Sequence, residues 1–228
     1  MIYVLLGFAF GLLIPYIARR FEKFMPATAA YALYRIIKPN KFVKRAKRKN
    51  NHKHIKLMKA YMIYSLGWAV VCSALSYLAL VSFGSFYIVW NLAFIWILLL
   101  LFEIDKRMFL LPDILTIPLL ISGFLFAALT SGWIIAGESA VGAFAGYLIP
   151  VIASIFLVWK HKEVFGGGDI KLLAAVGAWV GIESLLYIII LSCVIFVLYA
   201  LANRKRDGAF GPSIVMASII VAFMIYGM

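Results

Sequence analysis

The sequence predicts an all-α, polytopic membrane protein with about eight transmembrane helices. Hydrophobic residues make up 65% of the 228 positions and charged residues 14%, whereas soluble proteins have about 45–50% and about 25%. Apolar stretches long enough to cross about 30 Å of hydrocarbon recur along the whole chain. The short alternating segments of a membrane β-barrel are not seen in the sequence.

The positions of Lys and Arg set the direction of the crossings. The predicted crossings are residues 2–18, 60–82, 85–102, 113–130, 139–159, 170–181, 183–203 and 212–227. All 22 basic residues fall in four regions between these crossings, which are 19–59, 106–107, 160–171 and 204–206. If each basic region faces the cytosol, the chain follows the positive-inside pattern. We therefore expect a multi-pass inner (plasma) membrane protein with its N-terminus outside and a first helix that is not a cleaved signal peptide.

The sixth predicted crossing, residues 170–181, is short, because twelve helical residues span only about 18 Å. Lys171 and Arg204 should lie on the same side of the membrane, so the chain must cross an even number of times between them. We therefore expect either a short helix that thins the bilayer or one that begins inside the membrane boundary, with Asp169 slightly below the surface. Amphipathic rings are favoured at membrane boundaries, and two tryptophans fall near predicted boundaries, Trp133 and Trp179.

Composition divides the chain into an N-terminal membrane region, residues 1–84, and a second region, residues 85–228. The first contains the sizeable polar segment of the chain, a predicted basic cytosolic loop over 19–59, with no acidic residue between Lys41 and Lys59. Such a segment binds anionic lipid headgroups, at about 1 kcal/mol per basic residue near the surface. Binding to nucleic-acid phosphates is the alternative. We expect lipid contact and no nucleic acid.

The sequence predicts no metal site and no disulfide. His52 and His54 are two positions apart with no Cys, Asp or Glu nearby, which is a poor ligand set for zinc. Cys72 and Cys193 each lie inside an apolar stretch, where a cysteine behaves as a small core hydrophobe.

The acidic residues are few, and three of them fall in predicted cytosolic regions at one end of the bundle. Asp105 and Asp113 lie in FEIDKRMFLLPD, and Asp169 lies in VFGGGDIK. A carboxylate at the centre of a membrane helix costs about 2.5–3.5 kcal/mol, and less near the ends. These residues are therefore candidates for a functional site. Asp113 follows Pro112 and opens an apolar helix, which favours a capping role for it.

Two carboxylates brought together can hydrolyse a peptide bond. One ionised carboxylate takes a proton from water, while a protonated partner hydrogen-bonds the scissile carbonyl, and such a pair titrates as a unit. The glycines at 166–168 would let a substrate backbone approach Asp169 closely, although a flexible turn whose Asp caps the next helix is the alternative. No HExxH, GxSxG or Walker sequence competes with this interpretation.

Three segments of the chain resemble the motifs of type IV prepilin peptidases, a family of GxGD membrane aspartyl proteases. FEIDKRMFLLPDILTIPLL resembles their first catalytic segment, GGGDIKLLAAVGAWVG resembles their GxGD segment, and AFGPS (209–213) resembles a third short motif before the last helix. The order and spacing also match, with 169 − 105 = 64 positions between the two aspartates. The resemblance covers residues 85–228.

This resemblance implies an endopeptidase that removes the basic leader of prepilins or pseudopilins after a glycine, at the cytosolic face of the membrane. It implies Asp105 and Asp169 as the catalytic pair and leaves Asp113 outside that pair. No cofactor is implied for proteolysis. The residues implied to bind substrate or shape the site are Gly166, Gly167, Gly168, Lys171, Gly211 and Pro212.

Many bacterial members of this family also methylate the new N-terminus with S-adenosylmethionine, and commonly carry two CxxC pairs in the first cytosolic loop. The loop here has no cysteine, so that zinc site is excluded there, and methyl transfer stays open. A small proton- or cation-coupled transporter, with Asp105 and Asp169 as ion ligands, is the alternative function. The position of both carboxylates at one end of the bundle, and the lack of an inverted repeat, argue against it. The sequence indicates neither the particular substrate nor the oligomeric state.

Overall fold

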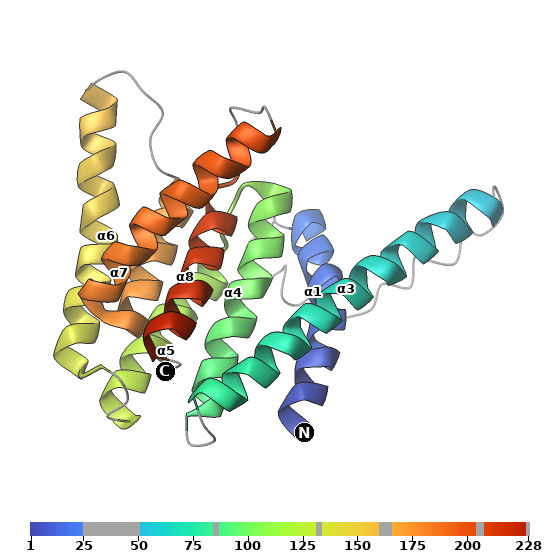
Figure 1. Ribbon diagram of the computed structural model, residues 1–228. Coiled ribbons are helices and arrows are strands. Elements are labelled where there is room, and N and C mark those ends of the chain that lie inside the picture. Colours follow the sequence, from blue (N-terminus) through green and yellow to red (C-terminus); the bar gives the residue numbers. More distant parts are fainter. Residues whose placement is uncertain (25–50, 84–86, 131–133, 160–165, 204–207, 227–228) are drawn as a thin grey trace. The chain divides into compact units, whose positions relative to one another are not determined.

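The computed structural model describes residues 1–24, 51–83, 87–130, 134–159, 166–203 and 208–226 (Figure 1). All regular structure in these ranges is helical, which confirms the predicted all-α class. The helices are α1 (Ile2–Phe24), α3 (Asn51–Phe83), α4 (Ile88–Met108), α5 (Asp113–Thr130), α6 (Ala136–Trp159), α7 (Gly167–Asn203) and α8 (Gly211–Tyr226). Six of them are long and apolar enough to cross a membrane, and α8 is a shorter apolar helix.

Two helix ends differ from the sequence prediction. The crossing predicted over 85–102 continues as α4 to Met108, so Asp105 lies in a helix rather than in the loop after it. The predicted basic loop over 19–59 is also too long, because α1 continues to Phe24 and α3 begins at Asn51; residues 25–50 lie outside the described residues. Lys and Arg are good helix formers, so a helix does not have to end where its apolar run ends.

The chain forms two compact units, Met1–Leu78 and Ala79–Met228. In the first unit, α1 packs on α3 through two glycines on one face of α1. A Cβ at Gly11 would lie 2.5 Å from Cα of Ala69, and a Cβ at Gly7 would overlap Ser76. Glycines four residues apart are a common means of close contact between membrane helices. The sequence GFAFG, residues 7–11, carries this signal.

In the second unit, α6 and α7 make the closest contact, through the same spacing of glycines. A Cβ at Gly142 would overlap the carbonyl of Gly177, and a Cβ at Gly146 would overlap the carbonyl of Leu173. The Ser139 hydroxyl donates to the Ala178 carbonyl at 2.6 Å. The two backbones therefore approach to a distance that excludes any side chain larger than hydrogen at these glycines.

Helix α7 is divided at Gly181, whose φ of 72° and ψ of 176° are not helical. We call residues 167–180 the first arm and 182–203 the second arm. In one straight helix, residues 169 and 196 would lie about 40 Å apart, yet both border the same cavity, so the chain folds back at Gly181. Glycine adopts this backbone conformation without strain. The two arms correspond to the sixth and seventh predicted crossings.

Trp179 of the first arm lies in the core of the second unit, so its ring does not face lipid as that of a boundary residue would. Its ring is fully buried, stacks on Phe126 and lies close to Phe94. The indole N–H donates to the Leu119 carbonyl at 2.8 Å. Because its indole N–H is already hydrogen-bonded inside the bundle, this tryptophan does not need the polar groups of the membrane–water boundary. Trp133 lies outside the described residues.

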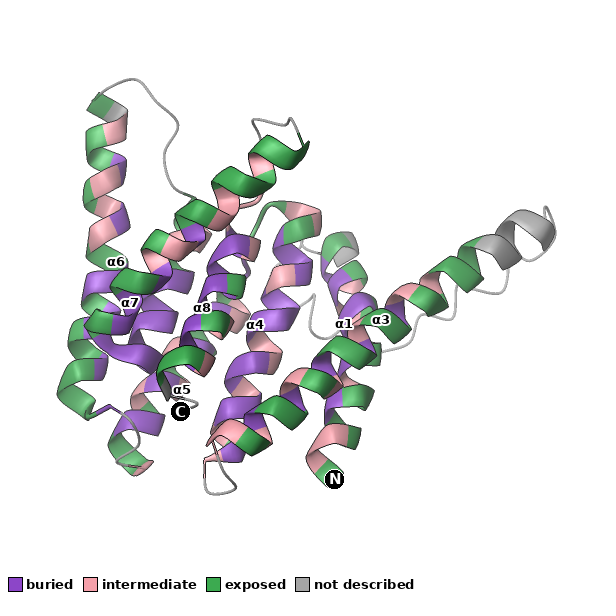
Figure 2. Ribbon diagram, viewed as in Figure 1, coloured by how far each residue is buried: buried purple, intermediate pink, exposed green. Residues whose placement is uncertain are grey.

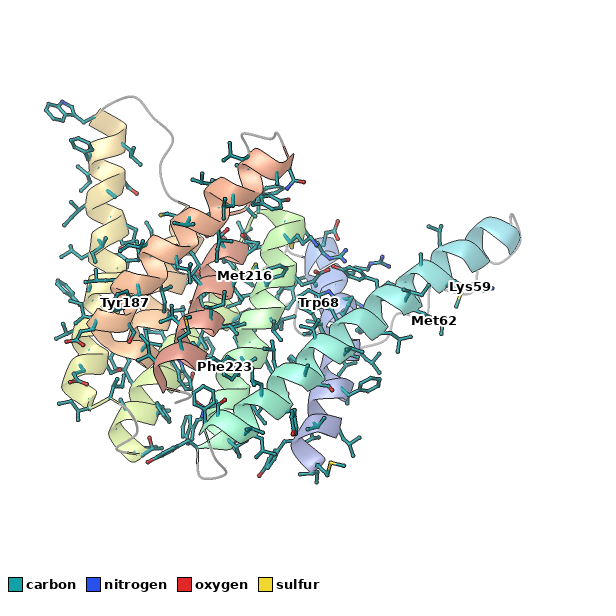
Figure 3. All side chains as sticks on the ribbon, in the orientation of Figure 1. Lys59, Met62, Trp68, Tyr187, Met216 and Phe223 are labelled. Carbon is teal, nitrogen blue, oxygen red and sulfur yellow. The ribbon has the colours of Figure 1, made fainter. Side chains whose placement is uncertain are left out.

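The outward surfaces of the helices carry large apolar side chains. Tyr187 of α7 and Met216 of α8, both labelled in Figure 3, are exposed. Figure 2 shows buried residues along the first arm of α7 and mostly exposed ones along the second arm. An apolar exterior of this extent is expected for helices that face lipid rather than water.

Candidate active site

Asp105 lies in the last turn of α4, where only 4% of the residue is exposed. Its Oδ2 atom is buried and accepts no hydrogen bond of good geometry among the described residues, although the backbone of Gly211 lies beside the carboxyl group. The helix ends at Met108, and the next residue, Phe109, is left-handed and donates its N–H to the Asp105 carbonyl at 2.9 Å. An unpaired buried carboxyl oxygen is costly, which is the kind of feature found where a substrate or water binds.

Asp169 lies in the first turn of α7, directly after the three glycines. A Cβ at Gly168 would lie 2.9 Å from Cβ of Leu111, and a Cβ at Gly166 would lie 3.2 Å from Oδ2 of Asp169. Nothing lies within 4 Å of a Cβ added at Gly167. The space therefore requires glycine at 168, is tight at 166, and would accept a side chain at 167.

The start of α8 approaches Asp105 through Gly211. A Cβ at this position would lie 2.5 Å from Oδ2 of Asp105 and 3.0 Å from its Cγ. Pro212 follows in the first turn of the helix. Backbone N–H groups there have no partner within the helix, so proline, which lacks an N–H, loses no hydrogen bond. The third motif therefore places backbone against the Asp105 carboxyl group, and any side chain at 211 would displace it.

The two aspartates border one cavity of about 460 Å³ and also a smaller one of about 160 Å³. Their carboxyl groups are close enough to interact electrostatically. The larger cavity is bounded mainly by α7, the segment 208–210 just before α8, and residues of α4 and α6. The smaller one is bounded by the glycines and Leu110–Leu111. The structure therefore brings Asp105 and Asp169 together, from helices that are far apart in the sequence.

Asp113, the third candidate carboxylate, borders neither of these two cavities. It begins α5 and pairs with Lys171, whose Nζ donates to both carboxylate oxygens at 2.7 and 2.8 Å. Both side chains are about half exposed, and such pairs contribute about 0–1 kcal/mol. Lys171 thus connects the starts of α5 and α7 instead of reaching the two cavities.

Glu103 was not among the predicted site residues, and it is fully buried in α4. Its carboxylate accepts a hydrogen bond from Arg107 Nε at 2.6 Å. The spacing of four between a glutamate and an arginine is a signal for this pair. Glu103 and Asp105 lie about 200° apart around the helix, so Glu103 is directed away from Asp105.

The two cysteines differ in their exposure, and Cys193 is not the buried core residue that was predicted. Both are free: Cys72 is buried in the first unit, as expected, whereas Cys193 is exposed and borders the larger cavity. Within the described ranges, no group of three His, Cys, Asp or Glu side chains is placed to hold a metal ion. The side chains of His52 and His54 lie outside the described residues.

A bundle of apolar helices with two carboxylates at one cavity defines a helical membrane protein with a paired-carboxylate site. Known sequences identify its family. A sequence model described as the type IV leader peptidase family matches residues 92–201, which include both aspartates. A Vibrio cholerae protein named prepilin leader peptidase/N-methyltransferase is 30% identical over 183 residues, covering 78% of this chain and 71% of that protein. The chain belongs to the type IV leader peptidase family, as its three motifs predicted.

Other relatives carry the same name. The Aeromonas salmonicida protein is 38% identical over 135 residues, which are 55% of this chain and 45% of that protein. The Escherichia coli K12 protein is 41% identical over 125 residues, which are 51% of this chain and 55% of that protein. The chain thus spans about half the length of these two curated relatives. No solved structure matches the chain.

Proposed function

We propose that this chain is an aspartyl endopeptidase that removes the leader of prepilins or pseudopilins, with Asp105 and Asp169 as its catalytic pair. The observation that carries this proposal is that carboxylates from two helices border the same cavity. The buried Oδ2 of Asp105, which accepts no hydrogen bond of good geometry among the described residues, gives that cavity a polar atom that can bind water or substrate. The names of the relatives support the substrate class.

The pair would act on a peptide bond lying between the carboxyl groups. One carboxylate removes a proton from a water molecule, whose oxygen attacks the scissile carbonyl, while the protonated partner donates a hydrogen bond to the carbonyl oxygen. The C–N bond then breaks as the amine leaving group takes up a proton. The two carboxyl groups share one proton through this cycle, since two adjacent charges are unfavourable.

The glycines would set the distance between backbone and carboxyl groups. Gly168 and Gly211 leave no room for a Cβ beside Leu111 and Asp105, respectively, and Gly166 is close to Asp169. Pro212 would fix the start of α8, and Lys171 would hold the start of α7 to α5 through Asp113. Gly167 has open space, so a substrate backbone can approach it.

Substitution of the aspartates tests the proposal. Asp105→Asn and Asp169→Asn keep the shape of each side chain but remove its ability to exchange a proton. We expect each variant to insert normally and to lack cleavage of a purified prepilin, and the double variant to be no worse, because the pair acts as one unit. Wild-type activity should fall at high pH as the pair loses its shared proton.

Asp113→Asn is the matched control, since it changes a neighbouring carboxylate that borders neither of the two cavities. It should retain substantial activity. Normal cleavage by both Asp105→Asn and Asp169→Asn would refute the peptidase function. An inactive Asp113→Asn beside an active Asp105→Asn would instead show that the first catalytic residue is assigned wrongly.

The relatives' names include a second activity, N-methyltransferase, for which S-adenosylmethionine would be the methyl donor. The lining of the larger cavity among the described residues includes two carboxylates but no basic side chain for the carboxylate of that donor. We therefore assign no residue to it. Mass spectrometry of the cleaved product, with and without the donor, tests this activity: a gain of one methyl group would demonstrate it.

We infer an inner-membrane location with the N-terminus outside and the site at the cytosolic face, from the distribution of Lys and Arg. A variant with Cys72 and Cys193 replaced by Ala would receive single cysteines at Asn50, Ser131 or Asp207. An impermeant thiol reagent applied to intact cells should label position 131 and spare the other two. Labelling at position 50 would contradict the orientation.

We also infer that the basic segment contacts anionic lipid and not nucleic acid; most of it lies outside the described residues. Neutralising Lys44, Arg45, Lys47 and Arg48 together should weaken activity only modestly, because prepilin leaders are basic and would not be attracted by these residues. Complete loss of cleavage in a correctly inserted variant would show a direct role in catalysis or substrate binding.

A further inference from the structure

Most of the wall of the larger cavity has no role in the proposed chemistry. A volume of about 460 Å³ exceeds the space of one water molecule, about 30 Å³, and lies within the range of ligand sites. Apart from the two carboxylates, the wall is mainly apolar, with side chains that include Phe109, Leu157, Cys193, Phe196, Val197 and Phe210. Such a wall can bind an apolar part of the peptide that the carboxylates cleave.

Phe109 is placed unusually for a phenylalanine. Its φ of 53° and ψ of 34° make it the one non-glycine residue with positive φ in the described ranges. This conformation is disfavoured for a bulky residue, and glycine is the usual residue that ends a helix in this way. The residue is also 66% exposed, so burial of its ring does not offset the strain. Strained residues of this kind cluster at ligand sites.

Phe109 also lies where the two cavities meet. The residues that border both the 460 Å³ and the 160 Å³ cavity are Asp105, Phe109, Gly166 and Asp169. Among these, Phe109 contributes the one apolar side chain. A peptide that extends from one cavity to the other past the carboxyl groups therefore passes the Phe109 ring.

A second aromatic surface faces the same cavity. Phe196 of the second arm and Phe210, just before α8, contact each other edge to face with ring centroids 5.4 Å apart. Both border the larger cavity but not the smaller one. The larger cavity thus has three phenylalanines in its wall, from three separate segments of the chain.

We propose that Phe109 is a substrate-binding residue that, with Phe196 and Phe210, forms an aromatic subsite for a bulky apolar side chain next to the scissile bond. The proposal rests on the peptidase function proposed above. The ligand class is an aliphatic or aromatic side chain of the substrate peptide. The left-handed backbone of Phe109 holds its ring at the boundary between the cavities, where it also orients the peptide against the carboxyl groups.

The experiment compares two peptide substrates in cleavage by purified full-length enzyme. The peptides are identical except beside the scissile bond, on the side that becomes the new N-terminus, where one has a bulky apolar residue and the other alanine. The wild type should prefer the bulky peptide. Phe109→Ala should lower kcat/KM for the bulky peptide by about tenfold or more, mainly through KM, because burial of one such side chain has that effect. Its rate on the alanine peptide should change far less.

Phe144→Ala is the matched control, because Phe144 of α6 is 65% exposed, much as Phe109 is, but does not border either cavity. It should keep the wild-type preference. Phe109→Gly removes the same ring while relieving the backbone strain, so it should lose the preference without losing thermal stability. If Phe109→Ala instead loses activity because it misfolds, its melting temperature should fall, and Phe109→Gly should recover both the melting temperature and the activity.

The proposal is overturned if the wild type cleaves both peptides equally well, if Phe109→Gly keeps the preference, or if Phe109→Gly loses activity equally on both peptides. These outcomes leave the peptidase function standing, because cleavage itself is observed. If the wild type cleaves no prepilin at all, the proposed function fails first, and the subsite fails with it.

Discussion

The two arms of α7 are joined at Gly181 but differ sharply in their surroundings. Every residue from Leu172 to Gly181 is buried, whereas the buried residues of the second arm are Ser184, Leu185, Ile188 and Ser192. The first arm carries Asp169 and packs on α6 through backbone contacts at glycines. The second arm contributes exposed side chains such as Cys193 and Val197 to the wall of the larger cavity.

This difference suggests separate roles for the two arms: the first fixes the geometry of the aspartate pair, and the second determines which substrates fit. The first arm holds its aspartate through contacts that any added atom would disturb, so its sequence is tightly restricted by packing. The wall on the second arm consists of side chains with free space beside them, so they can change size without moving the backbone. We therefore expect substitutions on the first arm to affect folding and catalytic rate, and those on the second arm to affect the choice of substrate.

The largest effect is expected where α6 meets the first arm. Gly142→Leu would force a side chain into the backbone of Gly177 and Gly181, at a cost above the about 1–3 kcal/mol of ordinary overpacking, because backbone cannot move aside easily. Little monodisperse protein should be recovered in detergent. Gly137→Leu, on the same helix with open space around it, should behave like the wild type. Equal recovery of both variants would show that this contact does not restrict the fold.

A smaller but still large effect is expected for the glycines before Asp169. Gly168→Ala should lower kcat about 100-fold, as displacements of about 1 Å at a catalytic group can do, because its Cβ meets Leu111. Gly167→Ala, with open space, should keep its rate within a few-fold. Both variants add the same methyl group at adjacent positions, so the difference between their kcat values measures the effect of the space available at each position. The prediction is wrong if Gly167→Ala has a lower kcat than Gly168→Ala.

A moderate effect is expected at Trp179, the buried tryptophan of the first arm. Trp179→Phe removes the hydrogen bond to the Leu119 carbonyl and leaves a gap, so the free energy of unfolding should fall by about 1–3 kcal/mol. Tyr187→Phe on the second arm removes a hydroxyl from an exposed side chain and should change stability little. Thermal unfolding of both variants in the same detergent measures the contrast, and equal shifts would contradict it.

The smallest effect is expected for the ion pair between Asp113 and Lys171. A double-mutant cycle with Asp113→Asn and Lys171→Met should give a coupling energy below about 1 kcal/mol, because both side chains are about half exposed and water screens the pair. High salt should reduce the coupling further. A coupling of several kcal/mol would show that the starts of α5 and α7 are held by this pair rather than by packing.

Sequence reasoning predicted the helices and the aspartate pair because both follow from where charges and apolar runs fall. The positions of Lys and Arg placed Asp105 and Asp169 at the same end of the bundle, and the structure brings them to one cavity.

The lining of the cavity could not be predicted, because α7 and α8 are apolar on all sides and hydropathy does not set the rotation of such a helix about its axis. Phe196 and Cys193 were missed for this reason, whereas Phe210 precedes α8 in the AFGPS motif, of which only Gly211 and Pro212 were assigned to the site. Phe109 was missed because its left-handed backbone depends on how α4 ends, which neighbouring residues decide. The glycine pair of α6, four residues apart in GAFAG, was readable in the sequence and was overlooked.

The first arm of α7 and helix α8, which both begin beside the aspartate pair, are short, and this affects the bilayer around them. The first arm has fourteen residues from 167 to 180, and α8 has 16, so they extend about 21 and 24 Å, below the about 30 Å of a hydrocarbon core. A bilayer matched to these two helices must be thinned locally at the site. Thinning brings headgroups and water toward the carboxyl groups, which need water for hydrolysis. If the chain is the proposed peptidase, we therefore expect its rate to change with the acyl-chain length of the surrounding lipid.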